Sequence, residues 1–468
     1  MTNHQLPTDI RVKDVSLFLM PVETRVPLKF GSETLFSVTC ARAKVTVEDR
    51  NGKTASGWGE TPLSVQWVWP SELSYSVRHD ALVRFTKTLA SEWLKFNEFG
   101  HPIELSHSFQ SHVLHQTQDK FCRSSTELSE PMPYLAGLVA MSVFDQAIHD
   151  AFGMLHEVDI YQTYNSEFMS KNLSAFLIAD DGSTDAFNGK YPADFLETEI
   201  PTALPVWHLV GGLDPLSPTE LTGDEPDDGY PVALTDWIER DGLECLKIKL
   251  RGNDWDWDYD RLEKIGKISL AQNVKWLTAD FNCTVHDPEY VNSILDKLSL
   301  EMPKVSQKIL YVEQPFPYDL ETHAIDVHSV SKRKPLFLDE SAHDWKLVRL
   351  GRKLGWSGVA LKTCKTQTGA LLSLCWAKAH DMPLMVQDLT NPMLAQIPHV
   401  RLAAHAGTIM GVESNAMQFY PDASKPEQAI HPGLYQRRNG VLDLSTIGKF
   451  GFGYRVDEIT RSLPDCCL

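Results

Sequence analysis

The sequence lacks the features that mark several large classes of protein. Its eight cysteines include no Cys-x-x-Cys pair, which favours scattered reduced thiols. No apolar run approaches the ~20 residues that cross a bilayer, and the first residues lack the basic-then-apolar pattern of a signal peptide. We therefore expect a cytoplasmic protein with no membrane partner.

Clusters of lysine and arginine are also missing. The formal net charge is −18, which argues against a nucleic-acid partner. An acidic balance of this kind commonly serves solubility, so it identifies no substrate. The hydrophobic content of 43% and charged content of 23% are those of an ordinary soluble globular protein. A chain of 468 residues is long enough for a barrel and a smaller domain.

The N-terminal third changes from a strand pattern to a helical one. Residues 37–48 are rich in β-branched side chains, and residues 49–52 supply the turn chemistry of a hairpin. Residues 71–155 then show apolar positions at helical spacing. Strands and helices in separate blocks predict an α+β domain over residues 1–160.

Residues 161–203 follow as an insertion or linker with little periodicity. From residue 204 the pattern alternates between strand and helix, which predicts a parallel barrel over residues 204–434. An acidic, glycine- and proline-rich segment at 214–230 is expected to loop over its rim. The turn-rich residues 435–468 are expected to return to the first domain. The predicted strands are 204–212, five that end at 250, 282, 315, 341 and 364, then 383–389 and 409–415.

Five charged residues stand at the ends of successive apolar runs in this alternating region. They are Lys249, Asp280, Glu313, Asp339 and Lys362, roughly 23–33 residues apart, where a TIM barrel of ~250 residues uses ~31 for each strand and helix. The active site of such a barrel lies where its strands end. The spacing therefore brings three carboxylates and flanking lysines to one rim.

Three hard oxygen ligands on neighbouring strands favour a metal site. Mg²⁺ prefers octahedral oxygen ligands and keeps open positions for water or substrate, with Mn²⁺ as the alternative ion. No histidine or cysteine is present among Asp280, Glu313 and Asp339, which argues against zinc. The competing interpretation is three separate strand-end charges, each paired with a lysine or solvated.

The lysines are candidate acid/base groups. Lys247 and Lys249 share one face of their strand because alternate residues point the same way. Burial beside Mg²⁺ and a second lysine should lower a lysine pKa from ~10.4 toward neutrality, which suits a general base. Lys362 is expected to reach the same rim from across the barrel, whereas Lys365 lies an odd number of positions away and is expected to face elsewhere. A structural salt-bridge network is the alternative.

These motifs together resemble the enolase superfamily, in the group of muconate lactonizing enzymes, mandelate racemase and dipeptide epimerases. The resemblance implies a modified TIM (β/α)7-8β barrel and an α+β capping domain formed by both ends of the chain. The residues that carry it are Lys247-x-Lys249, Asp280-Phe-Asn282, Glu313-Gln-Pro315, Asp339-Glu-Ser341, Leu361-Lys362, Gly57-Trp-Gly-Glu60, Ser142–Gly153 and Gly451-Phe-Gly453.

The resemblance also implies an activity. Such enzymes remove the proton α to a substrate carboxylate, with Mg²⁺ stabilising the enediolate, and a lysine can serve as the base. A racemase, epimerase, cycloisomerase or β-eliminating enzyme acting on a small carboxylate is expected. Carried over residue by residue, Asp280, Glu313 and Asp339 bind the metal, Lys249 and Lys362 are the two acid/bases, and Lys247 assists Lys249. Asn282 and Glu340 are then neighbours of the metal.

The sequence departs from the family pattern at several places. No double glycine follows Lys362, and Asp388 stands where a histidine base would be expected. Glu413 and Asn415 replace the Asp-x-Asp with which dipeptide epimerases hold an ammonium group, so dipeptides are expected to be poor substrates. An N-acylated amino acid or a hydroxylated acid is expected instead.

Three questions stay open at this level. An acid-sugar dehydratase and a catalytically silent metal-binding barrel are the alternative functions. Trp67 and Trp69 are equally compatible with a wall of the substrate pocket, with core packing and with an oligomer contact. A homo-oligomer is therefore left open as a partner.

Overall fold

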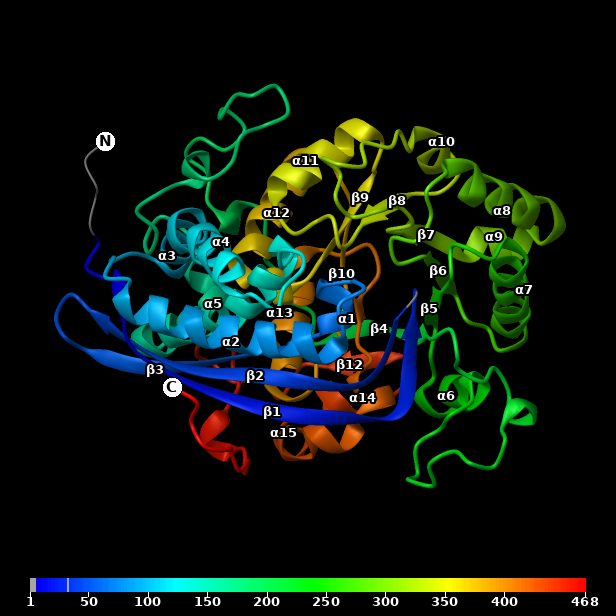
Figure 1. Ribbon diagram of the computed structural model, residues 1–468, viewed down its shortest axis with the longest axis horizontal. Helices are drawn as coiled ribbons and strands as arrows, with labels where there is room; N and C mark the ends of the chain where they lie inside the picture. The colour runs from blue at the N-terminus through cyan, green and yellow to red at the C-terminus, as the bar shows by residue number, and fades with distance from the viewer. Residues whose placement is uncertain (1–5, 32) are drawn as a thin grey trace.

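An antiparallel sheet opens the fold (Figure 1). The computed structural model describes residues 6–31 and 33–468, and the structural statements below concern these residues. Strands β1 (Ile10–Phe30), β2 (Glu33–Asp49) and β3 (Thr54–Pro62) pair in the order β1-β2-β3. The turn between β2 and β3 is closed by Asp49, whose carboxylate accepts hydrogen bonds from the backbone N–H groups of Asn51 and Lys53.

Helices cover one side of this sheet, and the longest lies closest to it. Glycine makes the close packing possible, because a Cβ at Gly57 would lie 2.0 Å from Ala151 N and one at Gly59 would lie 2.1 Å from Val143 O. Both contacts are with α5, which explains the glycines of the Gly-x-Gly-Glu motif. The helices are α1 (Val65–Val68), α2 (Tyr75–Lys95), α3 (Pro102–Phe109), α4 (His115–Ser124) and α5 (Tyr134–His156), with a π-helical turn at Gln110–Leu114.

Eight parallel strands form a curled sheet behind this layer (Figure 1). Their order is β10-β9-β8-β7-β6-β5-β4-β11, so each strand pairs with its neighbour in sequence and β11 returns to β4. The predicted fold class is confirmed, although most strands end one to three residues earlier than expected. The strands are β4 (Ala203–Val210), β5 (Cys245–Lys249), β6 (Trp276–Asp280), β7 (Ile309–Glu313), β8 (Leu336–Leu338), β9 (Gly358–Leu361), β10 (Leu384–Val386) and β11 (Val412–Glu413).

Helices connect these strands on the outside. Three of them begin at an aspartate, Asp254, Asp287 or Asp344, whose carboxylate accepts a backbone N–H of the first turn. The helices are α6 (Leu234–Asp241), α7 (Trp255–Ala271), α8 (Pro288–Glu301), α9 (Pro303–Lys308), α10 (His328–Ser331), α11 (Trp345–Leu354), α12 (Gln367–Ala379) and α13 (Gln396–Ala406).

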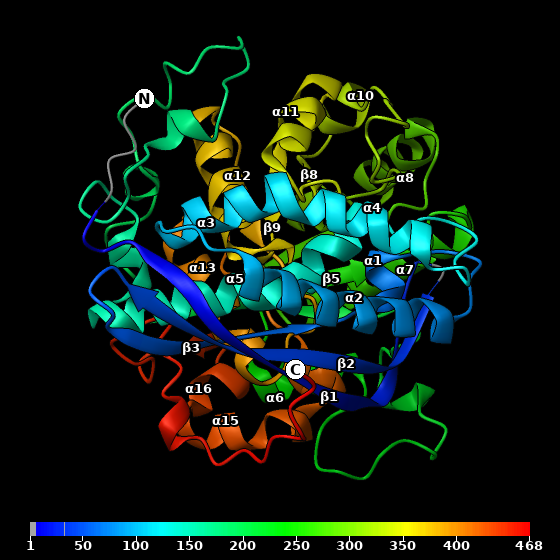
Figure 2. The ribbon, with the colours of Figure 1, turned by 60° about the vertical axis from the view of Figure 1, so that its left-hand side comes forward.

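The C-terminal segment returns to the N-terminal sheet, as Figure 2 shows for α15 (Lys425–Ile430) and α16 (Pro432–Tyr435). It also contains α14 (Ala416–Phe419) and β12 (Val441–Asp443), which pairs antiparallel with β4. Gly451 lies against Gly153 of α5, where a Cβ on Gly153 would come within 2.6 Å. The end of the chain therefore packs against α5 of the N-terminal region.

Neither of the two insertions reaches the pocket described below, as far as the described residues show. The first runs along the outside of α11 and α12. Its Asp180 forms ion pairs with Arg349 and Arg352, and Phe187 is fully buried. The segment at 214–230 is tied to the first strand by Arg25, which donates two hydrogen bonds to Asp228 (2.5 and 2.8 Å).

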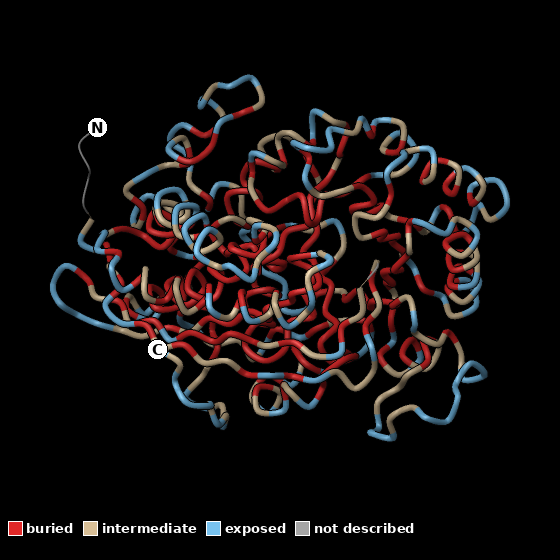
Figure 3. Tube along the Cα trace, in the orientation of Figure 1, coloured by how far each residue is buried: buried red, intermediate tan, exposed pale blue. Residues whose placement is uncertain are grey.

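The core runs continuously from the N-terminal sheet through α5 into the barrel (Figure 3). Within the part of the chain that the structure describes, no helix combines the length and apolarity needed to cross a membrane. All eight cysteines are unpaired, as the sequence predicts.

Candidate active site

The predicted charged residues meet at the carboxyl ends of the parallel strands. The strand register places Lys249 beside Asp280 and Asp280 beside Glu313. Asp339 and Lys362 follow the last residues of β8 and β9. All five are buried, with Asp280 and Glu313 fully enclosed. Parallel strands that each end in one charged residue therefore concentrate opposite charges within the barrel mouth.

Lys247 is the centre of this arrangement. Its Nζ donates to Glu313 Oε1 at 2.5 Å, Gln387 Oε1 at 3.1 Å and Glu413 Oε2 at 3.2 Å, and it lies 3.1 Å from Asp280 Oδ2. One ammonium group thus joins residues from four strand ends. Asp280 and Glu313 lie close together because both contact the same nitrogen.

The two predicted acid/base lysines each pair with a different carboxylate. Lys249 Nζ lies 2.5 Å from Asp280 Oδ2. Lys362 Nζ lies 2.8 Å from Asp339 Oδ2 and donates to the backbone oxygen of Asp388 at 2.9 Å. Both lysines line one enclosed cavity.

Lys365 contacts the same carboxylate as Lys362 but does not line the cavity, so the expectation that it faces elsewhere is met only in part. Its Nζ donates to the backbone oxygens of Asp339 (2.5 Å) and Ala360 (3.4 Å) and to Asp339 Oδ1 (3.3 Å). It is buried but is not among the cavity-lining residues. We infer that Lys365 fixes the turn that carries Asp339, and that Lys362 is the lysine available to a substrate.

The lowered pKa predicted for a lysine beside bound Mg²⁺ and a second lysine stays a prediction, and the carboxylates of the cluster act on the lysine pKa values in the opposite direction. Burial lowers the pKa of Lys247, but the charges of Glu313, Glu413 and Asp280 outweigh burial and raise it well above its ordinary value. Burial likewise lowers the pKa of Lys362, but Asp339 and the other acidic groups around it together raise this pKa above its ordinary value. The sequence does not show how many carboxylates surround each ammonium, so it gives no measure of this opposing effect.

The carboxylates also differ from one another. Burial raises the pKa of Glu313 well above its ordinary range, and Lys247 only partly offsets this. Burial acts in the same direction on Asp280 and Asp339, but the lysines beside them bring the pKa of each below its ordinary value. Glu313 therefore holds a proton more tightly than Asp280 and Asp339 do.

The residues fit a hard divalent cation, although the side chains are not yet gathered around one. Glu313 Oε2 and Glu340 Oε2 are buried carboxylate oxygens without a hydrogen-bond partner in the described residues. An unsatisfied buried charged acceptor costs more than ~1–3 kcal/mol, which a cation would offset. No three acidic, histidine or cysteine side chains of residues 6–31 and 33–468 are close enough together to hold an ion as they stand. Lysine ammonium groups occupy the space between the carboxylates instead.

The cavity between the lysines is small and mixed in character. Its volume is about 40 Å³, and Lys247, Lys249 and Lys362 form its polar wall. The remaining lining residues are mostly apolar and come from both the N-terminal unit and the barrel: Leu28, Phe30, Leu35, Ser64, Trp67, Leu209, Asp388, Leu389, Thr390 and Glu413. The N-terminal strands and α1 thus supply the apolar wall over the charged one.

The sequence leaves the roles of Trp67 and Trp69 undecided, and the two side chains lie in different places. Trp67 lines the cavity, and its indole Nε1 donates to Glu340 Oε1 at 2.8 Å. Trp69 is fully buried in the N-terminal unit and donates to Glu130 Oε1, also at 2.8 Å. Asn282 Nδ2 donates to the same Glu340 oxygen at 3.4 Å, so the two predicted neighbours of the metal lie together.

The polar side chains at the end of the eighth strand, β11, already bind other residues of the protein. Glu413 Oε2 contacts Lys247, and Glu413 Oε1 accepts a hydrogen bond from Asn415 Nδ2 at 2.7 Å. Asn415 Oδ1 accepts from the backbone of Leu209 at 2.9 Å. The carboxylate of Asp388 accepts the backbone N–H groups of Asn391 and Asn415. This edge holds the strand ends together.

Sequence reasoning missed two glutamines that organise the site. Gln387 bonds Lys247 and Tyr311, and its place directly before Asp388 at the end of a strand was the available signal. Gln314 Oε1 accepts the backbone N–H groups of Asp339 (2.8 Å) and Ser341 (3.2 Å). Gln314 thereby joins the Glu-Gln-Pro and Asp-Glu-Ser motifs.

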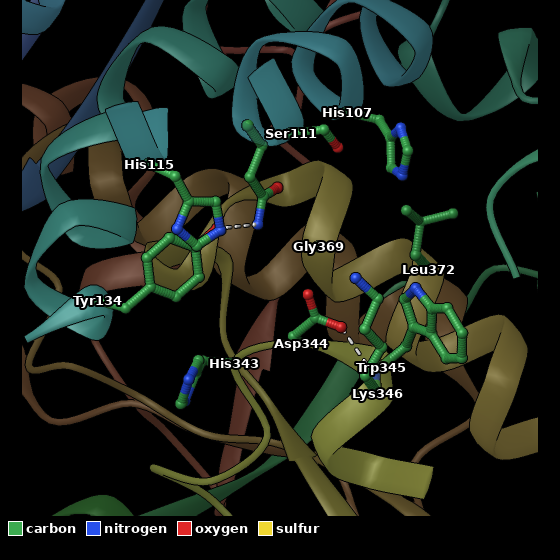
Figure 4. Close-up of a pocket in the computed structure, with 11 residues that line it drawn as sticks. His107, Ser111, His115, Tyr134, His343, Asp344, Trp345, Lys346, Gly369 and Leu372 are labelled. Carbon is green, nitrogen blue, oxygen red and sulfur yellow. Dashed lines mark hydrogen bonds between the residues drawn. The ribbon is translucent and has the colours of Figure 1, made fainter. Parts of the chain in front are cut away.

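A second cavity of about 180 Å³ lies between the N-terminal helices and the starts of α11 and α12 (Figure 4). Its polar lining includes His107, His115, His343 and Lys346. His343 Nδ1 is 2.7 Å from the backbone oxygen of Glu340. None of the residues predicted for the site lines this cavity, so we place the active site in the smaller one.

Comparison with known proteins agrees with the geometry. Residues 231–460 match the family model described as enolase C-terminal domain-like. This match places the chain in the enolase superfamily. No curated protein sequence matches the chain significantly.

Solved structures of this superfamily share the fold at low sequence identity. The dipeptide epimerase from Cytophaga hutchinsonii, complexed with Mg and D-Ala-L-Val, aligns with a TM-score of 0.62 and 16% identity over 98% of this chain and 100% of that one. The N-succinyl Arg/Lys racemase from Bacillus cereus ATCC 14579 aligns with 0.60 and 15% over 96% and 97%. The muconate lactonizing enzyme from Mycobacterium smegmatis, complexed with muconolactone, aligns with 0.59 and 13% over 97% and 100%. Structures of this fold thus include racemases, epimerases and lactonizing enzymes.

Proposed function

We propose that the protein is a Mg²⁺-dependent enzyme that removes the proton α to the carboxylate of a small acid. The observation that carries the proposal is the meeting of three lysines and three carboxylates at successive strand ends, beside a small cavity that the three lysines line. Racemisation or epimerisation is the outcome favoured by two lysines, Lys249 and Lys362, at one cavity. Cycloisomerisation and β-elimination use the same first step.

Asp280, Glu313 and Asp339 would hold the metal. Their oxygen ligands suit Mg²⁺, and the unpartnered Glu313 Oε2 gives that ion a ligand. When bound, Mg²⁺ supplies positive charge that stabilises the negative charge developing on a substrate carboxylate. With Asp280 and Asp339 engaged as ligands, Lys249 and Lys362 would be free to accept and donate a proton at the α-carbon.

The cavity wall supports a substrate with an apolar side chain and no ammonium group at the eighth strand. Glu413 and Asn415 are occupied by Lys247 and Leu209 N. A substrate ammonium placed there would forgo a charge-assisted hydrogen bond of about 1.5–3 kcal/mol. The apolar wall also argues against a polyhydroxylated acid sugar. We therefore propose an N-acylated apolar amino acid, and one structural neighbour is an N-succinyl amino acid racemase.

Proton exchange with solvent tests the proposal directly. The protein is incubated with MgCl₂ in D₂O, and ¹H NMR follows the α-proton of N-acetyl-D- and N-acetyl-L-leucine, of L-Ala-L-Xaa dipeptides and of a wider set of carboxylic acids. Loss of the α-signal of the N-acetyl amino acids is expected. Efficient epimerisation of a dipeptide would overturn the argument about Glu413 and Asn415. Absence of exchange with every acid would instead support a catalytically silent barrel.

A further inference from the structure

Trp67 contacts two groups of the active site from the N-terminal unit. Its indole ring lies 4.5 Å from Lys362 Nζ, measured to the ring centroid. Its Nε1–H donates to Glu340 Oε1 at 2.8 Å. The side chain is 8% exposed, so both contacts are shielded from water. A cation over an aromatic face and a hydrogen bond to a buried carboxylate are both strengthened by such shielding.

Lys362 Nζ has few contacts besides the Trp67 ring. Its Nζ contacts Asp339 Oδ2 and the backbone oxygen of Asp388 on the barrel side, and the face of Trp67 covers another direction. If Asp339 turns toward a bound metal ion, the Trp67 ring and the Asp388 oxygen are the contacts that still hold the ammonium. Trp67 is therefore placed to keep Lys362 at the cavity when its ion pair is lost.

Glu340 is held in a similar way. Its Oε1 accepts hydrogen bonds from Trp67 and Asn282, whereas its Oε2 has no partner among the residues described. The indole N–H thus binds one oxygen of Glu340 and leaves the other without a partner. A single residue of the N-terminal unit therefore contacts both groups.

We propose that Trp67 is a positioning residue: its ring face holds the Lys362 ammonium and its N–H orients Glu340, so that docking of the N-terminal unit completes the acid/base group on one face of the substrate. This inference rests on the proposed function for its catalytic consequence. The contact itself can be measured independently of any reaction.

Two pairs of variants separate the parts of the contact. Trp67→Phe keeps an aromatic face and removes the N–H, whereas Trp67→Leu removes both. Trp69→Phe and Trp69→Leu are matched controls, because Trp69 is also buried and also donates an indole hydrogen bond of 2.8 Å to a glutamate, Glu130, outside the site.

The first readout is competitive acetylation by trace acetic anhydride in the presence of Mg²⁺, with mass spectrometry comparing Lys362 and Lys249 in each sample. Trp67→Leu should raise the Lys362/Lys249 labelling ratio by about 3- to 30-fold, the range that the strength of a cation–π contact allows. Trp67→Phe and both Trp69 variants should keep the wild-type ratio. An unchanged ratio in Trp67→Leu, or an equal rise in Trp69→Leu, would overturn the proposal.

The second readout is α-proton exchange of N-acetyl-D-leucine and N-acetyl-L-leucine in D₂O, measured separately. Trp67→Leu should slow exchange of the enantiomer that depends on Lys362, identified with Lys362→Ala, by about 3- to 30-fold and leave the other at the wild-type rate. An equal loss for both enantiomers would indicate a merely structural role and contradict the proposal. If the wild type exchanges neither acid, the proposed substrate class fails, and the labelling ratio still supports or overturns the Trp67–Lys362 contact.

Discussion

Two buried clusters of opposite charges, one in the barrel and one in the cap, differ in the cation that each uses. The barrel cluster consists of Lys247, Lys249, Lys362, Asp280, Glu313 and Asp339. The cap cluster consists of Arg42, Glu60, Glu427 and Arg461 and joins the N-terminal sheet to the C-terminal segment. Arginine stays protonated and forms fixed forks with carboxylates, whereas a lysine pKa shifts with its surroundings. We therefore propose a structural role for the cap cluster and proton transfer for the barrel cluster.

Removing a barrel lysine gives the largest expected effect and tests the catalytic half of this comparison. Lys362→Ala should lower racemisation by about 10²- to 10⁴-fold, the usual contribution of a positioned acid/base group. The protein should stay folded, and α-proton exchange of one enantiomer should persist through Lys249. Polarimetry and enantiomer-resolved ¹H NMR measure the two quantities. An unchanged racemisation rate would exclude Lys362 from the reaction.

Removing a cap arginine should affect folding instead. Arg42 Nε donates to Glu60 Oε2 at 2.5 Å and its Nη2 to Glu427 Oε1 at 3.1 Å, with all three residues buried. Arg42→Ala leaves buried carboxylates uncompensated, so the free energy of unfolding should fall by about 3–5 kcal/mol. Urea denaturation measures this loss. The α-proton exchange rate per folded molecule should stay at the wild-type value, and a selective loss of exchange would contradict the division of roles.

Neutralising a barrel carboxylate tests whether the barrel cluster, unlike the cap cluster, binds Mg²⁺. Asp339→Asn removes one charge that the proposed site offers to Mg²⁺, and the affinity for Mg²⁺ should fall by about 100-fold or more, since outer partners alone contribute 10–100-fold. Isothermal titration calorimetry measures the affinity, with Arg42→Lys as a folded control from the cap cluster. Equal Mg²⁺ affinities in Asp339→Asn and the wild type would remove Asp339 from the ligand set.

The smallest expected effect is a pH dependence of stability from the cap cluster. Burial, with help from the charge of Glu427 and against that of Arg42, raises the pKa of Glu60 from 4.5 to about 7. The folded state thus retains a proton that the unfolded state releases, so this contribution to stability is full below about pH 4.5 and is lost as the pH rises to about 7. Urea midpoints at about pH 5 and pH 7.5 should show the decline. Glu60→Gln should flatten it, and an equal slope in the variant would assign the decline to other groups.

The chain order of the barrel could be predicted from the sequence because strand and helix patterns alternate, and five successive apolar runs each lead to a charged residue. Asp280, Glu313 and Asp339 carry this signal within a few residues of sequence. The contacts among them could not be predicted, since they join distant residues, such as Lys247 with Glu413, 166 residues apart. The raised pKa of Lys247 follows from those distant contacts. Local sequence gives the burial of a lysine but not the number of its carboxylate neighbours.

The contribution of the N-terminal unit was the least predictable part of the site. Trp67 and Trp69 are two residues apart in one apolar stretch, and the sequence gives no reason to separate them. Docking of α1 against the barrel turns Trp67 toward Lys362 and leaves Trp69 against Glu130. Gln387 and Gln314 likewise depend on the packing of neighbouring strand ends. Residues that complete a site across two units carry no local pattern.

The most direct test of the proposed metal site is a crystal structure of the protein soaked with Mn²⁺, with anomalous diffraction used to locate the ion. One strong peak is expected at the barrel mouth, within about 2.0–2.3 Å of oxygens from Asp280, Glu313 and Asp339, as for a Mg²⁺-like ion. Lys249 and Lys362 should then be displaced from these carboxylates and face the cavity. A peak elsewhere, or carboxylates that stay paired with the lysines in saturating Mn²⁺, would contradict the metal site and the proton-transfer chemistry proposed around it.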